Sequence, residues 1–191
     1  MKNNNQLQKQ AKLLRIFRKI HRTTCAFLFI NFLIISITGI LLGWKKHSYG
    51  EILPKNYSGS STVLKDWLPL DTLYKIASKT LNDSVSANLS TELERIDIRK
   101  NKGMLKFVFN DNYYEVQLDG ATGKILQIKY RFSDLIENIH DGSILDKWFG
   151  TASEEIKLIY TSISGLALLT FTITGVWLWF GPKRMKKNKS A

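Results

Sequence analysis

The sequence predicts a membrane protein in which two transmembrane helices flank a small extracytoplasmic α+β domain, with a helix packed on an antiparallel β-meander. Three observations support this fold class. Two uncharged apolar runs lie near the ends of the 191-residue chain, and the excess basic charge lies in the tails outside them. Between the runs, the apolar residues change from a helical period to a period of two.

The two apolar runs are long enough to cross a bilayer. Residues 23–44 and 158–181 carry no charge, and at 1.5 Å per residue each run spans about 33–36 Å, against roughly 30 Å of hydrocarbon. A helix satisfies every backbone polar group in lipid. We therefore predict transmembrane helices over residues 23–44 and 154–181. A cleaved signal peptide is the weaker alternative, because the first run exceeds the usual apolar length and no small-residue cleavage motif follows it.

The basic charge predicts an orientation. The net charge is +12, and residues 1–22 and 182–191 hold seven and five basic residues without one acid, which leaves 16 basic and 16 acidic residues between them. Basic flanks stay on the cytoplasmic side, so we expect both tails in the cytoplasm of a bacterium and the central domain outside its inner membrane. Charge concentrated at membrane flanks indicates membrane lipid as a partner and argues against nucleic acid.

The central segment predicts one small domain. Residues 45–66, rich in Ser, Gly and Asn, resemble a linker, and residues 67–131 form the domain. Apolar residues at helical spacing after Asp71 predict a helix over 71–82. Alternation then predicts strands over 94–99, 104–110, 113–118 and 124–130, with turns at 101–103, 110–112 and 119–123. We expect one sheet face to be buried beneath the helix.

A further amphipathic segment precedes the second membrane helix. Phe132, Leu135, Ile136 and Ile139 recur at helical spacing, and Trp148 follows. Aromatic residues suit the headgroup region, so residues 132–153 are expected along the outer membrane surface or over the helix ends.

The order of these parts resembles the PepSY-associated transmembrane proteins of bacteria. The stretches that carry the resemblance are "PLDTLYKIASKTL", "YYEVQLDGATGKILQI", "RKIHRTTCAFLFINFLIISITGILL" and "IHDGSILDKWFG" with the Thr-Gly-containing helix that follows. The resemblance implies a non-enzymatic binding or regulatory module, in a family associated with peptidase propeptides and iron uptake. Some larger members are haem-containing reductases of ferric siderophores, which is the alternative function.

Three histidines are candidate ligands of haem b. His47 and His140 are expected near the outer membrane face and could form a bis-histidine pair. His21 matches a family position at the inner face, where its partner ligand would come from a second copy. The simpler interpretation of each is a contact with headgroups or a helix end. The chain offers no clustered carboxylates and one cysteine, Cys25, so neither a metal site nor an internal disulfide is predicted.

Small residues predict helix packing, within the chain, with a protein partner or in a homo-oligomer. An Ile-Thr-Gly phrase occurs in both runs. Gly39 and Gly43 form a G-x-x-x-G motif, and Gly165 and Gly175 would allow close approach of another helix to the second apolar run. Asn31, polar within hydrocarbon, should face a partner helix, with a substrate path as the alternative. No catalytic motif is present, so the binding module remains the first expectation.

Overall fold

The computed structural model describes residues 2–110, 112–151 and 153–189. It divides into two compact units. The helix unit comprises residues 1–37 and 140–191, and the sheet unit comprises residues 38–139. Residue 1 and residues 190–191, the ends of the two basic tails, lie outside the described residues, as does Asp111 in the predicted turn 110–112.

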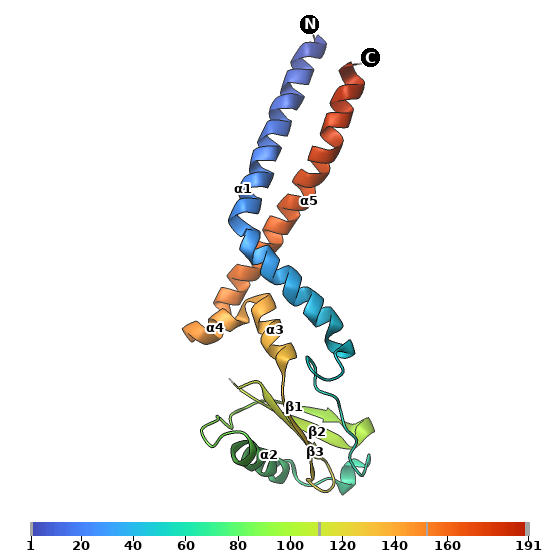
Figure 1. Cartoon of the computed structure of the whole chain (residues 1–191), viewed down its shortest axis with the longest axis vertical. Coiled ribbons are helices and arrows are strands. Elements are labelled where there is room, and N and C mark those ends of the chain that lie inside the picture. Colours follow the sequence, from blue (N-terminus) through green and yellow to red (C-terminus); the bar gives the residue numbers. More distant parts are fainter. Residues whose placement is uncertain (1, 111, 152, 190–191) are drawn as a thin grey trace. The chain divides into compact units, whose positions relative to one another are not determined.

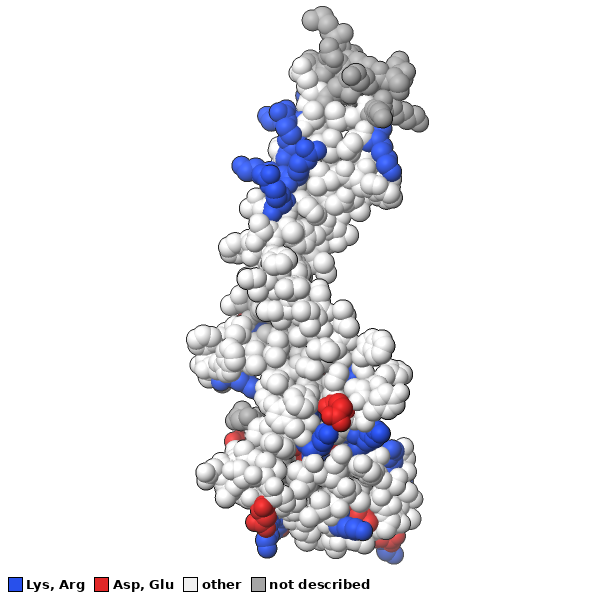
Figure 2. Space-filling view, in the orientation of Figure 1, with Lys and Arg blue, Asp and Glu red and all other residues white. Residues whose placement is uncertain are grey.

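Two helices are long and apolar enough to cross a membrane. They are α1 (Lys2–Trp44) and α5 (Glu155–Lys189). Helix α1 begins well before the predicted residue 23, so the basic tail continues the apolar helix. Only 6% and 11% of their most apolar stretches are buried, whereas the core helix of a soluble protein would be mostly buried. Figure 2 shows basic side chains near the N-terminal end of α1 and the C-terminal end of α5, and uncharged surface along the middle of both helices.

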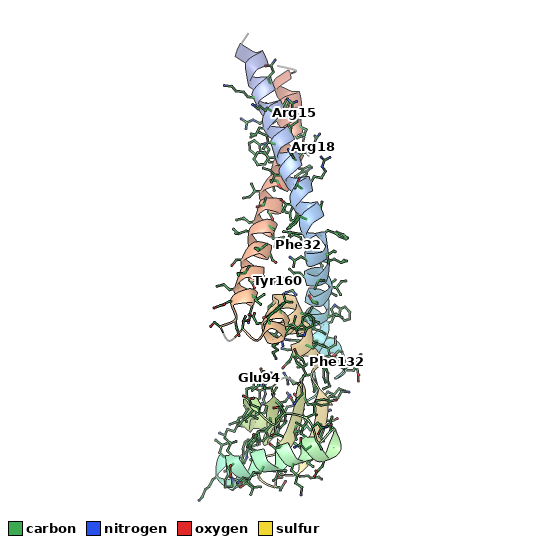
Figure 3. The ribbon with its side chains drawn as sticks, turned by 90° about the vertical axis from the view of Figure 1, so that its left-hand side faces the viewer. Arg15, Arg18, Phe32, Glu94, Phe132 and Tyr160 are labelled. Atoms are coloured by element: carbon green, nitrogen blue, oxygen red, sulfur yellow. The ribbon has the colours of Figure 1, made fainter. Side chains whose placement is uncertain are left out.

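Within the helix unit, α1 and α5 run antiparallel (Figure 1). The ring of Phe17 lies 5.7 Å from that of Trp177, and Phe32 (labelled in Figure 3) lies 5.1 Å from Phe171. The less exposed residues recur every three or four positions, as in a coiled-coil seam. On α5 this seam comprises Ser164, Ala167, Phe171, Thr174, Leu178 and Gly181, and on α1 it comprises Leu14, Phe17, His21, Thr24, Leu28, Asn31 and Ile35.

The sheet unit contains the predicted helix and four-stranded meander. Helix α2 (Leu70–Ser84) covers one face of an antiparallel sheet in the order β1-β2-β3-β4 (Figure 1). The strands are β1 (Leu93–Arg99), β2 (Met104–Phe109), β3 (Tyr114–Asp119) and β4 (Ile125–Tyr130). The core between helix and sheet consists of Leu73, Ala77, Leu81, Leu105, Phe107, Phe109, Val116 and Leu118. The strand residues of this core occupy alternate positions, on the face that was predicted to be buried.

The sheet differs from the prediction in its register and its second face. A register shift places Ile125, instead of Leu126, opposite Leu118. More importantly, both faces of β2 and β3 are buried, including Lys106, Glu115 and Gln117. The expectation of a single buried face was therefore wrong.

The segment expected to be a linker helps to cover the second face. After the 3-10 turn η1 (Lys45–His47), residues 52–60 form a strap, of which residues 55–60 bind the sheet and the turn before β2. The turn η2 (Leu64–Asp66) then leads to α2. The Gly59 N–H donates to the Lys102 carbonyl at 2.7 Å, in the short turn η3 (Lys100–Lys102). A Ser-, Gly- and Asn-rich composition is compatible with such a strap because its contacts are made largely by the backbone.

Two helices lie in the segment that was expected along the membrane surface. Helix α3 (Phe132–Asp141) and helix α4 (Ser143–Phe149) are separated by Gly142, whose φ is +83°. In the helix unit, Asp146 of α4 accepts the Ile156 and Lys157 N–H groups at 3.0 and 2.7 Å, which caps the start of α5. The exposed Trp148 and Phe149 suit a membrane interface.

Candidate functional site

The second face of the sheet holds the strap as it would hold an extended peptide. The Gln117 amide donates to the Lys55 carbonyl at 2.8 Å and accepts the Tyr57 N–H at 3.3 Å. From the turn before β2, the Lys102 ammonium donates to the Asn56 carbonyl at 3.0 Å. Gln117 is fully buried, whereas the Tyr57 side chain is about half exposed. The site therefore engages the backbone of the strap more than its side chains.

The end of the strap is anchored by Asp119 and by two glycines. The Asp119 carboxylate accepts the Ser60 N–H at 3.0 Å and the Ala121 N–H at 3.0 Å. Burial would raise the pKa of Asp119, but its hydrogen bonds with Ser60, Thr122 and Ala121 lower it on balance. A Cβ on Gly59 would overlap the Gly103 carbonyl oxygen. The close approach of strap and sheet thus requires glycine at position 59.

A buried ionic cluster lies next to Gln117 on the second face of the sheet. Glu115, which has no exposed surface, accepts from the ammonium of Lys106 at 3.2 and 3.3 Å and from the guanidinium of Arg131. Arg131 also donates to both oxygens of Asp134 at 2.8 and 3.0 Å, and Arg95 donates to Asp134 at 2.7 Å. The cluster joins β2 and β3 to the first turn of α3.

The cluster shifts the ionisation of its members. Burial would raise the pKa of Asp134, but hydrogen bonds and charge from Arg131 and Arg95 outweigh it and lower that pKa. Burial lowers the pKa of Lys106, and the neighbouring Glu115 opposes this shift without cancelling it. For Arg131, burial would lower the pKa, but Asp134 and Glu115 raise it. The guanidinium groups of Arg131 and Arg95 thus hold the Asp134 carboxylate in its charged form.

In the helix unit, His21 bonds to the Ile-Thr-Gly phrase of α5, residues 173–175. Its Nδ1 lies 2.8 Å from the hydroxyl of Thr174, and that hydroxyl donates to the Thr170 carbonyl at 2.6 Å. Because the hydroxyl hydrogen is used in this way, Thr174 accepts from an Nδ1–H of His21. This leaves Nε2 as the nitrogen that could bind a ligand. The edge of the Phe171 ring packs against His21 at 5.1 Å.

The other two histidines lie in different units. His47 belongs to the sheet unit, where it is exposed and lines a hollow at the end of α1. His140 belongs to the helix unit, half-buried near the end of α3. The pairing of His47 with His140 around a haem stays a prediction.

The predicted packing residues meet different surroundings. Asn31 donates to the Ser164 hydroxyl at 3.0 Å, so it faces the neighbouring helix as expected. A Cβ on Gly175 would lie 3.8 Å from His21, whereas a Cβ on Gly43 or Gly165 would meet nothing within 4 Å. Neither of those two glycines marks a contact within this chain. Their packing against another protomer stays a prediction, and Gly39 is half-buried in α1.

The sequence analysis did not predict burial of the second face of the sheet. The polar residues of this face alternate with apolar ones, a pattern typical of a face exposed to solvent. The available signal was the pair of opposite charges on adjacent strands, Lys106 and Glu115.

Among the described residues, no group of three or more His, Cys, Asp and Glu side chains could hold a metal ion. Comparison with family models, curated proteins and solved structures finds no match for the chain.

Proposed function

We propose that this chain is a membrane-anchored, PepSY-like binding module whose sheet unit, outside the cytoplasmic membrane, holds extended polypeptide segments. The observation that carries the proposal is the pairing of the Gln117 side chain with the backbone of residues 55 and 57. Backbone hydrogen bonds supply affinity for extended peptides with little dependence on sequence. The strap would then be the occupant in cis of a face that a partner's peptide can take.

The proposal is tested by releasing the strap in the full-length protein. Gly59→Ala places a Cβ against the Gly103 carbonyl and should therefore lift the strap. The matched control is Gly165→Ala, where the Cβ meets nothing within 4 Å. The ligand is a fluorescein-labelled peptide ILPKNYSGSS, the sequence of residues 52–61, with a scrambled peptide as its control.

Fluorescence anisotropy in detergent should show binding of the peptide to Gly59→Ala and much weaker binding to the control variant. Adding Gln117→Ala to Gly59→Ala should weaken binding roughly tenfold, because two hydrogen bonds are lost. A folded Gly59→Ala protein that binds neither peptide would reduce the strap to a structural element and refute the proposal.

A haem-binding electron-transfer function is the second candidate, and the orientation of His21 favours it. Histidines that bind metals usually donate their other ring N–H to an oxygen acceptor, as Nδ1 of His21 does with Thr174. Haem, when bound, would supply one-electron redox chemistry, and His21 of this chain together with His21 of a second copy would hold it. An absorption spectrum after expression with ample haem tests this function, and a Soret band unchanged in His21→Ala would exclude His21 as a ligand.

A further inference from the structure

An open, basic hollow lies in the sheet unit, where the apolar helix α1 ends. Its volume is about 670 Å³, and it is lined by Gly43, Trp44, Lys46, His47, Tyr49 and Lys55. These described lining residues include two lysines, a histidine and two aromatic rings, but no acid. Two acids of this unit pair with lysines outside the lining, Glu137 with Lys45 at 3.7 Å and Glu51 with Lys129 at 3.5 Å.

The turn between α1 and the strap is built to shape this hollow. Tyr49 adopts a φ of +56°, which is unfavourable for a bulky residue. Ser48 fixes the turn, since its hydroxyl donates to the Lys45 carbonyl at 2.8 Å and accepts the Ile52 N–H at 3.0 Å. A Cβ on Gly50 would lie 3.1 Å from Lys55 Cγ, so this glycine lets the Lys55 stem lie against the turn. Strained backbone of this kind is found at ligand sites.

The aromatic residues indicate the source of an anion. Trp44 and Tyr49 are 67% and 86% exposed beside the cations, and the apolar surface of α1 continues up to Trp44. Amphipathic rings next to lysines are typical of the headgroup layer of a bilayer. A site for free phosphate in water would gain nothing from two exposed rings.

We propose that this hollow binds the phosphate-containing headgroup of an anionic phospholipid, with Lys46 and Lys55 as the charged contacts and Trp44 and Tyr49 flanking the glycerol region. The inference rests on the membrane anchoring in the proposed function, but not on peptide binding. On this proposal, the end of α1 at Trp44 selects a particular class of lipid headgroup, in addition to anchoring the helix at the membrane interface.

The test measures binding of short-chain phosphatidylglycerol to the delipidated full-length protein in detergent by titration calorimetry. The double variant Lys46→Gln/Lys55→Gln removes both charges, and Lys46→Arg/Lys55→Arg retains them. The matched control, Lys65→Gln/Lys100→Gln, removes two exposed lysines of the same unit outside the hollow. Short-chain phosphatidylcholine and inorganic phosphate are the competing ligands.

The wild type, the arginine variant and the control should bind phosphatidylglycerol with the same affinity. The affinity of the Lys46→Gln/Lys55→Gln variant should be at least about tenfold lower. Equal affinity of that variant, or equal binding of phosphatidylcholine, would overturn the inference. Inorganic phosphate binding as tightly as the lipid would also overturn it, in favour of a soluble-anion site. Failure of the peptide experiment leaves this outcome unaffected, because the lipid test uses other variants and Lys55→Gln keeps the backbone carbonyl that Gln117 contacts.

Discussion

The Glu115 carboxylate lies fully buried among three donors, from Lys106, Arg131 and Gln117. A buried ion pair contributes little net stability compared with an apolar replacement, but removing one partner leaves the others uncompensated. In this protein, the cluster around Glu115 links β2 and β3 to the start of α3.

Glu115→Gln should therefore destabilise the protein strongly, by about 3–5 kcal/mol. The double substitution Lys106→Met/Glu115→Met should recover part of that loss, because Arg131 keeps its two bonds to Asp134. Urea unfolding of the full chain in detergent, followed by intrinsic fluorescence, measures both. A loss below about 1 kcal/mol for Glu115→Gln would show that the cluster is not closed to water.

Asp134 should make stability depend on acid pH. Its pKa is lowered in the folded state, so below the unfolded value of about 3.9 the unfolded chain binds more protons. The stabilisation from Asp134 is fully present above that value and is lost as pH falls through the folded pKa. Asp134→Asn should lower the urea midpoint at neutral pH and flatten its decline below about pH 4. An unchanged acid profile in Asp134→Asn would assign that decline to other carboxylates, such as Asp119.

At the scale of elements, the break between α3 and α4 depends on Gly142. Its φ of +83° disfavours any side chain, and a Cβ there would lie 2.7 Å from the ring of Tyr160 on α5. Tyr160 is labelled in Figure 3. The positive φ and the tight packing explain why a glycine stands between these two helices.

Gly142→Ala should cost about 1–3 kcal/mol. Gly165→Ala, in open surroundings within α5, serves as the control and should be neutral or mildly stabilising. Thermal unfolding of both variants in the same detergent compares them. Equal unfolding midpoints of the two variants would mean that the backbone at position 142 accommodates the alanine without strain.

The polar contacts between α1 and α5 should contribute modestly to their association. Asn31 bonds to Ser164 at 3.0 Å, and such bonds between membrane helices are worth about 0.6–2 kcal/mol. A double-mutant cycle with Asn31→Leu and Ser164→Ala should give a coupling within that range, measured by unfolding in detergent. Zero coupling would show that each residue finds another partner in lipid or detergent.

At the scale of the whole molecule, the basic ends of α1 and α5 and the exposed apolar surface between them support a two-span topology. Exposed residues at three points can report the side of the membrane: Lys12, Lys100 and Lys183. In a Cys25→Ser background, a single cysteine at position 100 should react with an impermeant maleimide on intact bacterial spheroplasts. Cysteines at 12 and 183 should react only after lysis. The reverse pattern would place the sheet unit in the cytoplasm.

The sequence by itself determined the elements whose patterns are local. Helix α2 and the four strands followed from the periods of residues such as Leu73, Phe107 and Val116, and the apolar lengths of α1 and α5 followed from composition. Each of these depends on residues only a few positions apart along the chain, which is why a pattern can reveal it.

Only the tertiary structure decided what lies on the second face of the sheet and which polar residues meet between the helices. In the sequence, Gln117 and Lys106 have the pattern of solvent-exposed residues. The structure shows Gln117 bonded to a segment some 60 positions away along the chain, and Lys106 buried against Glu115. His21 and Thr174, 153 positions apart, meet only because the two helices align antiparallel. Burial of a polar side chain depends on distant parts of the chain that supply its hydrogen-bond partners, and no local period encodes those parts.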